Sequence, residues 1–357
     1  MARRLGWPGY GAKSSAPRRP PAPSAQRRQL DRAPLRHSGC AMKMPRSTTR
    51  QGGAAIIAAL LVTALAAALA SSLLVSMDDW LSRVALERDK RASRELARSA
   101  LDYARSVLAD DGRRSAVDTP DEAWARILPP ILAEEAELGG RIEDLQGHWN
   151  LNNLLQNGVI DEGAVATYRK LLRALGVPGE QAVQLADSLA DWLDHDDSPR
   201  PAGAESAYYL ALQPAYPPAG RALDQLSNLL RIKGYSPALI ERLAPYVCVL
   251  PSQQPVNVNT APPEVLHAIQ PGLDLDAARQ LVLSRRSVYF RDLGDYRNRL
   301  PARDLPEAST ALAVGSSYFL VHTSARLQAP DGVATRLSAL LHRPLNSPPT
   351  LLWITEQ

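Results

Sequence analysis

The side chains whose types and spacing could do chemistry gather in one acidic loop. Asp194, Asp196 and Asp197 lie together just before a proline, and Glu205 follows after a glycine. Carboxylates that converge from an irregular loop supply the oxygen ligands that a hard cation such as calcium requires. The loop lacks EF-hand spacing, and its single histidine disfavours zinc. The sequence therefore predicts either a calcium site or a solvated acidic loop.

Signatures of catalysis are missing from the sequence. It contains no Gly-x-Ser-x-Gly, no His-Glu-x-x-His and no phosphate-binding loop. Cys248 stands in an apolar run, where we expect a buried small hydrophobic residue. Four of the six histidines are scattered through the body, and we expect each to lie in the core or at the surface: His148, His267, His322 and His342. We predict that the protein is not an enzyme.

Two related asparagine phrases stand far apart in the chain. The first contains Asn150 and Asn152, the second contains Asn257 and Asn259, and each precedes a helix, a turn and a second helix. Asparagine side chains in such phrases hydrogen-bond the backbone around a turn or a helix cap. We interpret the two phrases as a weak internal duplication of small helical units.

The second hairpin is also similar to the helix-hairpin-helix of DNA-binding competence proteins. Those proteins hold a phosphate on the backbone amides of a Gly-hydrophobic-Gly turn. Here the turn has Gly272 but no second glycine, and Asp274 and Asp276 would face the phosphate. The arginines nearby are Arg285, Arg286 and Arg291. DNA binding is therefore an alternative that the charges disfavour.

An uncharged segment, Ala54–Met77, is the strongest feature of the chain. Its 24 residues would form a helix of about 36 Å, enough to cross a bilayer. Basic residues precede it, and Asp78 and Asp79 follow it. This asymmetry predicts a single-pass anchor with a cytoplasmic N-terminus and an external body.

Three identities compete for this segment. It could be a plain signal anchor, a secretory signal cleaved before Ser71, or a helix preceded by a leader that is cleaved after Gly52-Gly53. No proline or glycine interrupts the chain from Ala54 to Asp111, so one long helix is expected. Its later part carries an apolar face expected to pack on a soluble body, formed by Leu96, Ala100, Tyr103, Ala104 and Val107. A continued helix disfavours the secretory signal.

Charge divides the chain unevenly. Residues 1–50 hold 12 Lys and Arg but one acid, whereas the rest holds 29 basic and 36 acidic residues. Residues 1–41 are therefore a basic arm or an over-extension, with translation starting at Met42 or Met44. The acidic body disfavours nucleic acid as a partner. With 45% hydrophobic residues among 357, that body is expected to be globular.

The periodicity of the body predicts a mixture of helices and strands. We expect the long helix to end at Asp110-Asp111-Gly112, and a short, proline-interrupted helix at Ala123–Ala136. The phrase at Trp149 is expected to open a helical stretch that reaches Trp192. Strands are expected at Arg141–Gln146, Tyr318–Leu327, Val333–Arg343 and Leu351–Ile354. The strands thus bracket a helical region.

Several phrases in this order closely resemble general secretion pathway protein K, the minor pseudopilin family of type II secretion. They are Arg50–Gly53, the uncharged helix, Gly147–Leu154, Asp191–Asp194, Gly203–Glu205 and Asn257–Ala261. The resemblance implies an α+β, pilin-like fold. A long N-terminal helix would pack on a small antiparallel sheet, and a large all-helical, SAM-like domain would be inserted between strands.

The resemblance also implies a domain order. The domains would be an extension (1–41), a prepilin leader (42–53), the transmembrane helix (54–77), its periplasmic half with the start of the pilin-like body (78–147), the inserted helical domain with its two units (148–315) and the C-terminal strands (316–357).

The function implied is that of a non-enzymatic subunit at the tip of the inner-membrane pseudopilus, seeding its assembly and supporting protein export. Prepilin peptidase would cut after Gly53 and leave a methylated Ala54. The fifth mature position is Ala58, where most pilins have Glu; a tip subunit has no neighbour ahead whose amine needs that charge. The family also binds calcium in its helical domain, and its partners are other minor pseudopilins, with exported proteins as further candidates. The alternatives are a membrane-anchored DNA-uptake protein and a periplasmic hydrolase with an acidic site.

Overall fold

A computed structural model describes residues 52–133, 136–302, 305–308, 310–328, 332–345 and 347–356. The predicted extension and most of the predicted leader lie outside these residues. The chain divides into two compact units, with the division between Leu69 and Ala70.

The long helix α1 runs without a break from Gly52 to Arg114. This confirms the uninterrupted helix predicted from the sequence. It ends later than predicted, because Arg113 and Arg114 in its last turn pair with Asp110 and favour the negative end of the helix dipole.

The first unit contributes most of the apolar part of α1, up to Leu69. Ile56, Leu60, Leu65 and the other large apolar side chains of this stretch are all more than half exposed. By length and composition, this helix could cross a membrane, and its most apolar window has no buried residue. A helix in the core of a soluble protein would instead bury that window.

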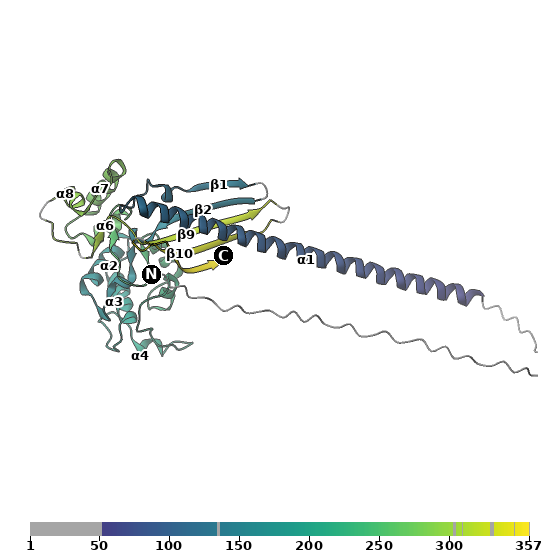
Figure 1. Ribbon diagram of the computed structural model, residues 1–357. Helices are drawn as coiled ribbons and strands as arrows, with labels where there is room; N and C mark the ends of the chain where they lie inside the picture. The colour runs from purple at the N-terminus through teal and green to yellow at the C-terminus, as the bar shows by residue number, and fades with distance from the viewer. Residues whose placement is uncertain are drawn as a thin grey trace, which may run out of the picture. The chain divides into compact units, whose positions relative to one another are not determined.

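The second unit contains a five-stranded antiparallel sheet in the order β1-β2-β9-β10-β11 (Figure 1). The bounds are β1 Leu128–Ala133, β2 Ala136–Asp144, β9 Tyr318–Leu327, β10 Ala334–His342 and β11 Thr350–Glu356. The predicted C-terminal strands are thereby confirmed. Burial alternates along most of β9, as a period of two requires, whereas β10 is buried continuously from Leu337 to Leu341 because both of its faces are covered.

The second half of α1 packs on this sheet with a face that differs from the predicted one. Ala97, Leu101, Ala104 and Leu108 are buried, whereas Tyr103 is 60% exposed. Of the predicted face, only Ala104 is fully buried. The buried face of the helix is thus shifted by about one residue from the predicted face. Ala97 and Ala104 lie against the sheet in place of Tyr103, and their small side chains let the helix approach closely.

The helix predicted at Ala123–Ala136 is wrong. The chain forms a short 3₁₀ turn at Ala123–Ala125 and then strand β1. Pro129-Pro130 explains the outcome, because proline cannot occupy a helix interior but is tolerated on an edge strand.

The helical region lies between β2 and β9, which are direct neighbours in the sheet. Its helices are α2 Glu162–Ala174, α3 Gly179–Leu193, α4 Ser206–Tyr209, α5 Pro237–Leu243, α6 Pro263–Ile269, α7 Leu275–Ser287 and α8 Leu293–Asn298. Short 3₁₀ helices occur at Leu145–Gly147, Leu151–Leu154 and Leu226–Arg231. Two-residue strands are β3 Trp149–Asn150, β4 Leu155–Gln156, β5 Val159–Ile160, β6 Val247–Cys248, β7 Val256–Asn257 and β8 Leu312–Ala313.

The two predicted helical hairpins are confirmed as α2–α3 and α6–α7. The helical stretch predicted to open at Trp149 is corrected, because strand β3 and a 3₁₀ turn occupy its start and α2 begins only at Glu162. One large core, with Trp149, Tyr168 and Trp192 fully or almost fully buried, joins these helices. The α+β class is thus confirmed: a long helix on an antiparallel sheet, with a helical insertion between neighbouring strands.

Candidate metal centre

The acidic loop connects two helices and brings three carboxylates together. Asp191 lies near the end of α3, Asp194 caps that end, and Glu205 immediately precedes α4. One ligand oxygen from each of these residues lies within 4.8 Å of the other two. The fold therefore converges three negative charges on one point.

The oxygens of this group lack partners among the described residues. Both carboxylate oxygens of Glu205 and Oδ1 of Asp194 are buried without a hydrogen bond, and Glu205 is only 3% exposed. Burial of an ionised, unpaired carboxylate is costly, so a site of this kind needs a counter-charge. This observation separates the loop from a solvated acidic turn.

Asp191 is held in place by the backbone of the loop. Its carboxylate accepts hydrogen bonds from the backbone N–H of Arg200 (3.1 Å) and of Ala204 (2.8 Å), and the Arg200 Nε lies 3.7 Å away. These donors fix the carboxylate against α3 before any ligand arrives. Asp191 was not among the predicted ligands, although it belongs to the group. Its spacing of three residues before Asp194, on one helix face, was the signal available.

Electrostatics agree with the geometry. Burial, followed by repulsion from Asp191 and Asp194, raises the pKa of Glu205 to about 8. Burial also raises the pKa of Asp191 to about 6. These raised pKa values reflect the cost of keeping buried, mutually repelling carboxylates ionised. A bound divalent cation would offset that cost by displacing the protons and neutralising the charges.

Two of the predicted ligands lie at the rim of the site. Asp196 and Asp197 are exposed, and each accepts a backbone hydrogen bond: from Ser198 at 2.9 Å and from Ser206 at 3.1 Å, respectively. Both still raise the pKa of Glu205 through their charge. Of the four predicted ligands, the structure thus brings Asp194 and Glu205 together, with Asp191 completing the group.

An all-oxygen donor set of this kind fits calcium. Calcium takes six to eight oxygen ligands in flexible geometry, and the three carboxylates could be completed by backbone carbonyls and water. The nearby His195 is exposed and lies outside the group. A zinc site would require nitrogen or sulfur ligands that the group lacks.

Gly203 allows the loop to close over Asp191. A Cβ at this position would lie 1.9 Å from the Asp191 Oδ2. We expect Gly203→Ala to displace the carboxylate, weaken metal binding and destabilise the fold by about 1–3 kcal/mol. Urea unfolding with and without calcium measures both effects. Gly179→Ala is the matched control, since its Cβ would meet no atom closer than 3.9 Å; equal losses in the two variants would contradict the prediction.

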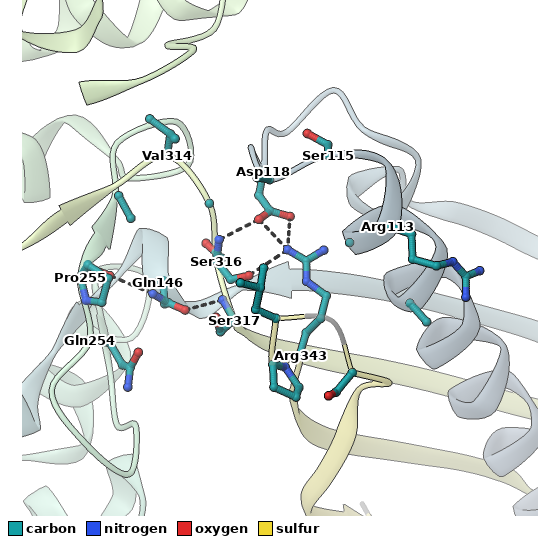
Figure 2. A pocket seen from close by; sticks show the side chains of 18 of the residues that line it. Arg113, Ser115, Asp118, Gln146, Gln254, Pro255, Val314, Ser316, Ser317 and Arg343 are labelled. Atoms are coloured by element: carbon teal, nitrogen blue, oxygen red, sulfur yellow. Dashed lines mark hydrogen bonds and ion pairs between the residues drawn. The ribbon is translucent and has the colours of Figure 1, made fainter. Parts of the chain in front are cut away.

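A second group of carboxylates already has its counter-charge. Asp111, Asp118 and Glu122 converge near the end of α1. The Arg343 guanidinium lies 2.7 Å from Asp111. It also lies 2.6 Å from Asp118, a contact that Figure 2 shows. Because the arginine occupies the position that a cation would take, this group is an internal ion-pair cluster.

This cluster joins the sheet to the helical insertion. Asn257 donates from Nδ2 to the Asp118 carbonyl (3.1 Å) and to the Asp144 carboxylate (3.0 Å). Ser316 donates from its backbone N–H to the Asp118 carboxylate and from its hydroxyl to the Asp144 carboxylate. Figure 2 shows Ser316 and Arg343 converging on Asp118. The base of the insertion therefore lies at the C-terminal end of α1.

The two asparagine phrases occupy equivalent places. Each lies on a short parallel pair, β3 with β6 and β7 with β8. Asn152 bonds both the N–H and the carbonyl of Leu223, and Asn259 does the same with Phe290. Each side chain thus replaces a neighbouring peptide group.

The first asparagine of each phrase closes the turn that follows it. Asn150 and Asn257 each accept a bond from the N–H two residues later. The side-chain amides of all four phrase asparagines donate hydrogen bonds to groups of the surrounding framework.

The hairpin considered for DNA binding presents little to a phosphate. Gly272 takes a left-handed backbone at φ +76°. The Arg285 side chain is buried and donates to the Val258 carbonyl at 2.6 Å, and burial lowers its pKa to about 10. The Arg285 guanidinium is therefore bound within the core and is not available to a phosphate at the hairpin.

The residues of the predicted cleavage site lie in the first turns of α1. Gly53, Ala54 and Ala58 are exposed helical residues. Among the described residues, no atom other than those of its chain neighbours and of the adjoining helix backbone lies within 4 Å of the position of a Gly53 Cβ.

Known proteins resemble this chain in sequence along most of its length. Residues 147–252 and 256–315 match family models described as type II secretion system (T2SS), protein K. The type II secretion system protein K of Pseudomonas aeruginosa is 35% identical, over 76% of this chain and 83% of that protein. The protein of the same name from Aeromonas hydrophila is 32% identical, over 80% and 91%.

A solved structure is similar in fold. It is the crystal structure of the GspK-GspI-GspJ complex from the type II secretion system of enterotoxigenic Escherichia coli, with a TM-score of 0.66 and 24% identity. The match covers 77% of this chain and 99% of the other. With relatives above 30% identity across most of their length, this chain belongs to the type II secretion system protein K family of minor pseudopilins.

Proposed function

We propose that this minor pseudopilin stands at the tip of the pseudopilus, where it seeds assembly and supports export of folded proteins across the outer membrane. The observation that carries the proposal is the position of the helical insertion. Its base lies at the C-terminal end of α1, where Asn257 bonds the Asp118 carbonyl and Arg343 pairs with Asp111. In a fibre of parallel α1 helices, this domain would fill the space that the next subunit ahead requires.

The apolar part of α1 supports an inner-membrane anchor with a cytoplasmic N-terminus and a periplasmic body. Basic residues precede it and Asp78 follows it, as the positive-inside rule requires. Prepilin peptidase would cleave after Gly53, and Ala58 would leave no unpaired carboxylate in the membrane. The helix would hold the subunit in the bilayer before assembly and pack into the fibre afterwards.

The partners proposed are other minor pseudopilins. The similar solved chain comes from a complex of GspK with GspI and GspJ, which supports an equivalent tip complex here. Exported proteins are further candidates for the periplasmic face. No catalytic role is proposed, and the acidic site is assigned to structure rather than to hydrolysis.

Calcium is the proposed ligand of the carboxylate group formed by Asp191, Asp194 and Glu205, with Asp196 and Asp197 at the rim. The buried, unpartnered oxygens of Glu205 support this assignment. Bound calcium would neutralise the group and fix the segment between α3 and α4, and so stabilise one side of the helical domain.

The mature N-terminal residue tests the proposal directly. We expect mass spectrometry of the protein from its native membrane to find N-methylated Ala54, because Gly53 stands at the border of the basic leader and the apolar helix. Ser71 at the N-terminus would mean a secreted soluble protein and would refute the tip role. An uncleaved start at Met42 or Met44 would leave a signal-anchored protein and would also refute it.

A further inference from the structure

The C-terminal strand β11 leaves one edge of the sheet open. Among the described residues it pairs with β10 alone. Leu351, Leu352, Trp353 and Ile354 are each 39–44% exposed, although they are consecutive large apolar residues. We call the outward backbone and side chains of Thr350–Glu356 the β11 edge.

The opposite edge of the same sheet is protected. Strand β1 contains Pro129 and Pro130, which lack the N–H groups that a further strand would need, and its register breaks between Leu128 and Ile131. The β11 edge has no proline, glycine or lysine. Leu352 forms a bulge, and Trp353–Glu356 then continue in regular register with β10. The two prolines of the β1 edge have no counterpart in β11, whose residues Trp353–Glu356 offer a regular edge beyond the bulge.

An open, apolar edge is recognised by an extended segment. Main-chain hydrogen bonds would hold an added strand, and alternate side chains would pack beside those of β11. Trp353 pairs with Leu340, on the sheet face away from α1, whereas Ile354 pairs with Ala339 on the face that α1 covers. A strand with apolar residues on both faces would therefore fit.

The β11 edge is too short to bind a freely diffusing protein tightly by strand pairing alone. Pairing along seven residues would bury less than the roughly 1,200–2,000 Å² of a stable complex between free proteins. A partner fixed in the same membrane would gain effective concentration and could pair without such an area.

The direction of α1 disfavours a second copy as that partner. Ser93 bonds the Ala325 carbonyl and Arg343 pairs with Asp111, so α1 runs parallel to β10 and antiparallel to β11. A two-fold antiparallel pair of β11 edges would make the two α1 helices antiparallel as well. Two anchors with opposite directions cannot both enter one membrane from the same side.

The geometry points to the β11 edge as the docking site for an extended strand of a different membrane-anchored pseudopilin subunit. This inference rests on the proposed anchoring of α1. Pairing would extend the sheet beyond β11 and cover the exposed apolar side chains.

Photo-crosslinking in cells that contain the whole secretion system tests this pairing. A benzophenone amino acid is placed at Trp353 or Ile354, on opposite faces, and at Leu345 as control. Leu345 is 82% exposed but precedes the strand. We expect both β11 positions to form an adduct with one membrane-anchored pseudopilin, and Leu345 to form none. Adducts between two copies, adducts with a soluble exported protein, equal yields at Leu345, or no adduct would each overturn the inference.

Lysine variants guard against misfolding as an explanation. Thr355→Lys replaces one exposed polar residue by another on the same sheet face as Trp353. Trp353→Lys removes the exposed aromatic side chain that a docked strand would cover. Leu345→Lys is the control. Both β11 variants should lose the adduct at Ile354 while the melting temperature matches that of the control. An unchanged adduct overturns the inference. A mature N-terminus at Ala54 without adducts would refute the edge pairing alone, whereas Ser71 would refute the tip role itself.

Discussion

Replacing Arg343 with methionine is expected to destabilise the protein by about 3–5 kcal/mol, the cost of leaving a buried charge without its partner. Arg343 is 8% exposed and Asp118 is 1% exposed, and the guanidinium also reaches Asp111. Methionine fills similar volume, so the loss measures the charge. Urea unfolding of the full chain in detergent gives the difference.

The pH dependence of this variant identifies the cause. Burial raises the pKa of Asp118, and Arg343 opposes that rise. Without the arginine, the pKa of the folded state rises further above that of the unfolded chain. The loss of unfolding free energy in Arg343→Met should therefore be greatest at alkaline pH, where Asp118 is ionised. It should shrink on acidification, because protonation of Asp118 removes the unpaired charge.

The matched control is Arg94→Met. Arg94 makes a bidentate pair with Glu356, but both side chains are more than 40% exposed. Solvent screens such a pair, so little change is expected. Equal destabilisation by the two variants, or a pH-independent loss in Arg343→Met, would contradict the ion-pair account.

Calcium is expected to stabilise the protein by about 2.7 kcal/mol at a concentration one hundredfold above its dissociation constant. The reason is that Glu205, Asp191 and Asp194 share a buried space without a counter-charge. Glu205→Gln removes one of these charges and should abolish the calcium response while leaving the metal-free protein as stable or more stable. Thermal unfolding with calcium or with a chelator measures the difference.

The calcium response should also depend on pH. The pKa of Glu205 is about 8 in the folded metal-free protein, above its ordinary value of 4.5, so the folded state binds more protons than the unfolded chain between these values. Metal-free stability should then fall as the pH rises through this window. Protons compete with the cation, so calcium should stabilise more at pH 8 than at pH 5.5.

Asp276→Asn is the control for the calcium experiment. Asp276 is an exposed carboxylate of α7 that pairs with Arg279, away from the proposed site. It should keep the full calcium response. A calcium response that survives in Glu205→Gln, or that is absent from the unaltered protein, would refute the assignment.

Local patterns predicted those parts of the fold whose side chains meet regular neighbours. The period of two in Tyr318–Leu327 reflects a strand with one buried face, and the uninterrupted run from Ala54 predicted α1. The same reasoning failed at Ala123–Ala136, where a helical apolar spacing competed with two prolines and the prolines prevailed. The exposed Tyr103 shows a related limit, because helix rotation depends on how closely the sheet can approach.

The candidate site was predicted only in part, since its closure depends on contacts distant in sequence. Asp194 and Glu205 follow from the loop itself, but Asp191 joins the carboxylate group because Gly203 lets the backbone return to it. The partner of Asp118 is Arg343, from the other end of the body. Because these two residues are 225 positions apart, no local sequence pattern could predict their ion pair.

The neighbouring positions of β2 and β9 have a consequence for the order in which the molecule folds. Asp144 pairs with Phe319, so closing this ladder before the insertion has folded would confine a very long loop at an entropic cost. A helical insertion that folds first would bring its own ends together and remove most of that cost. Three of the five strands of the sheet, β9, β10 and β11, follow the insertion in the chain. The sheet on which the second half of α1 packs therefore stays incomplete during synthesis until these three strands have been made.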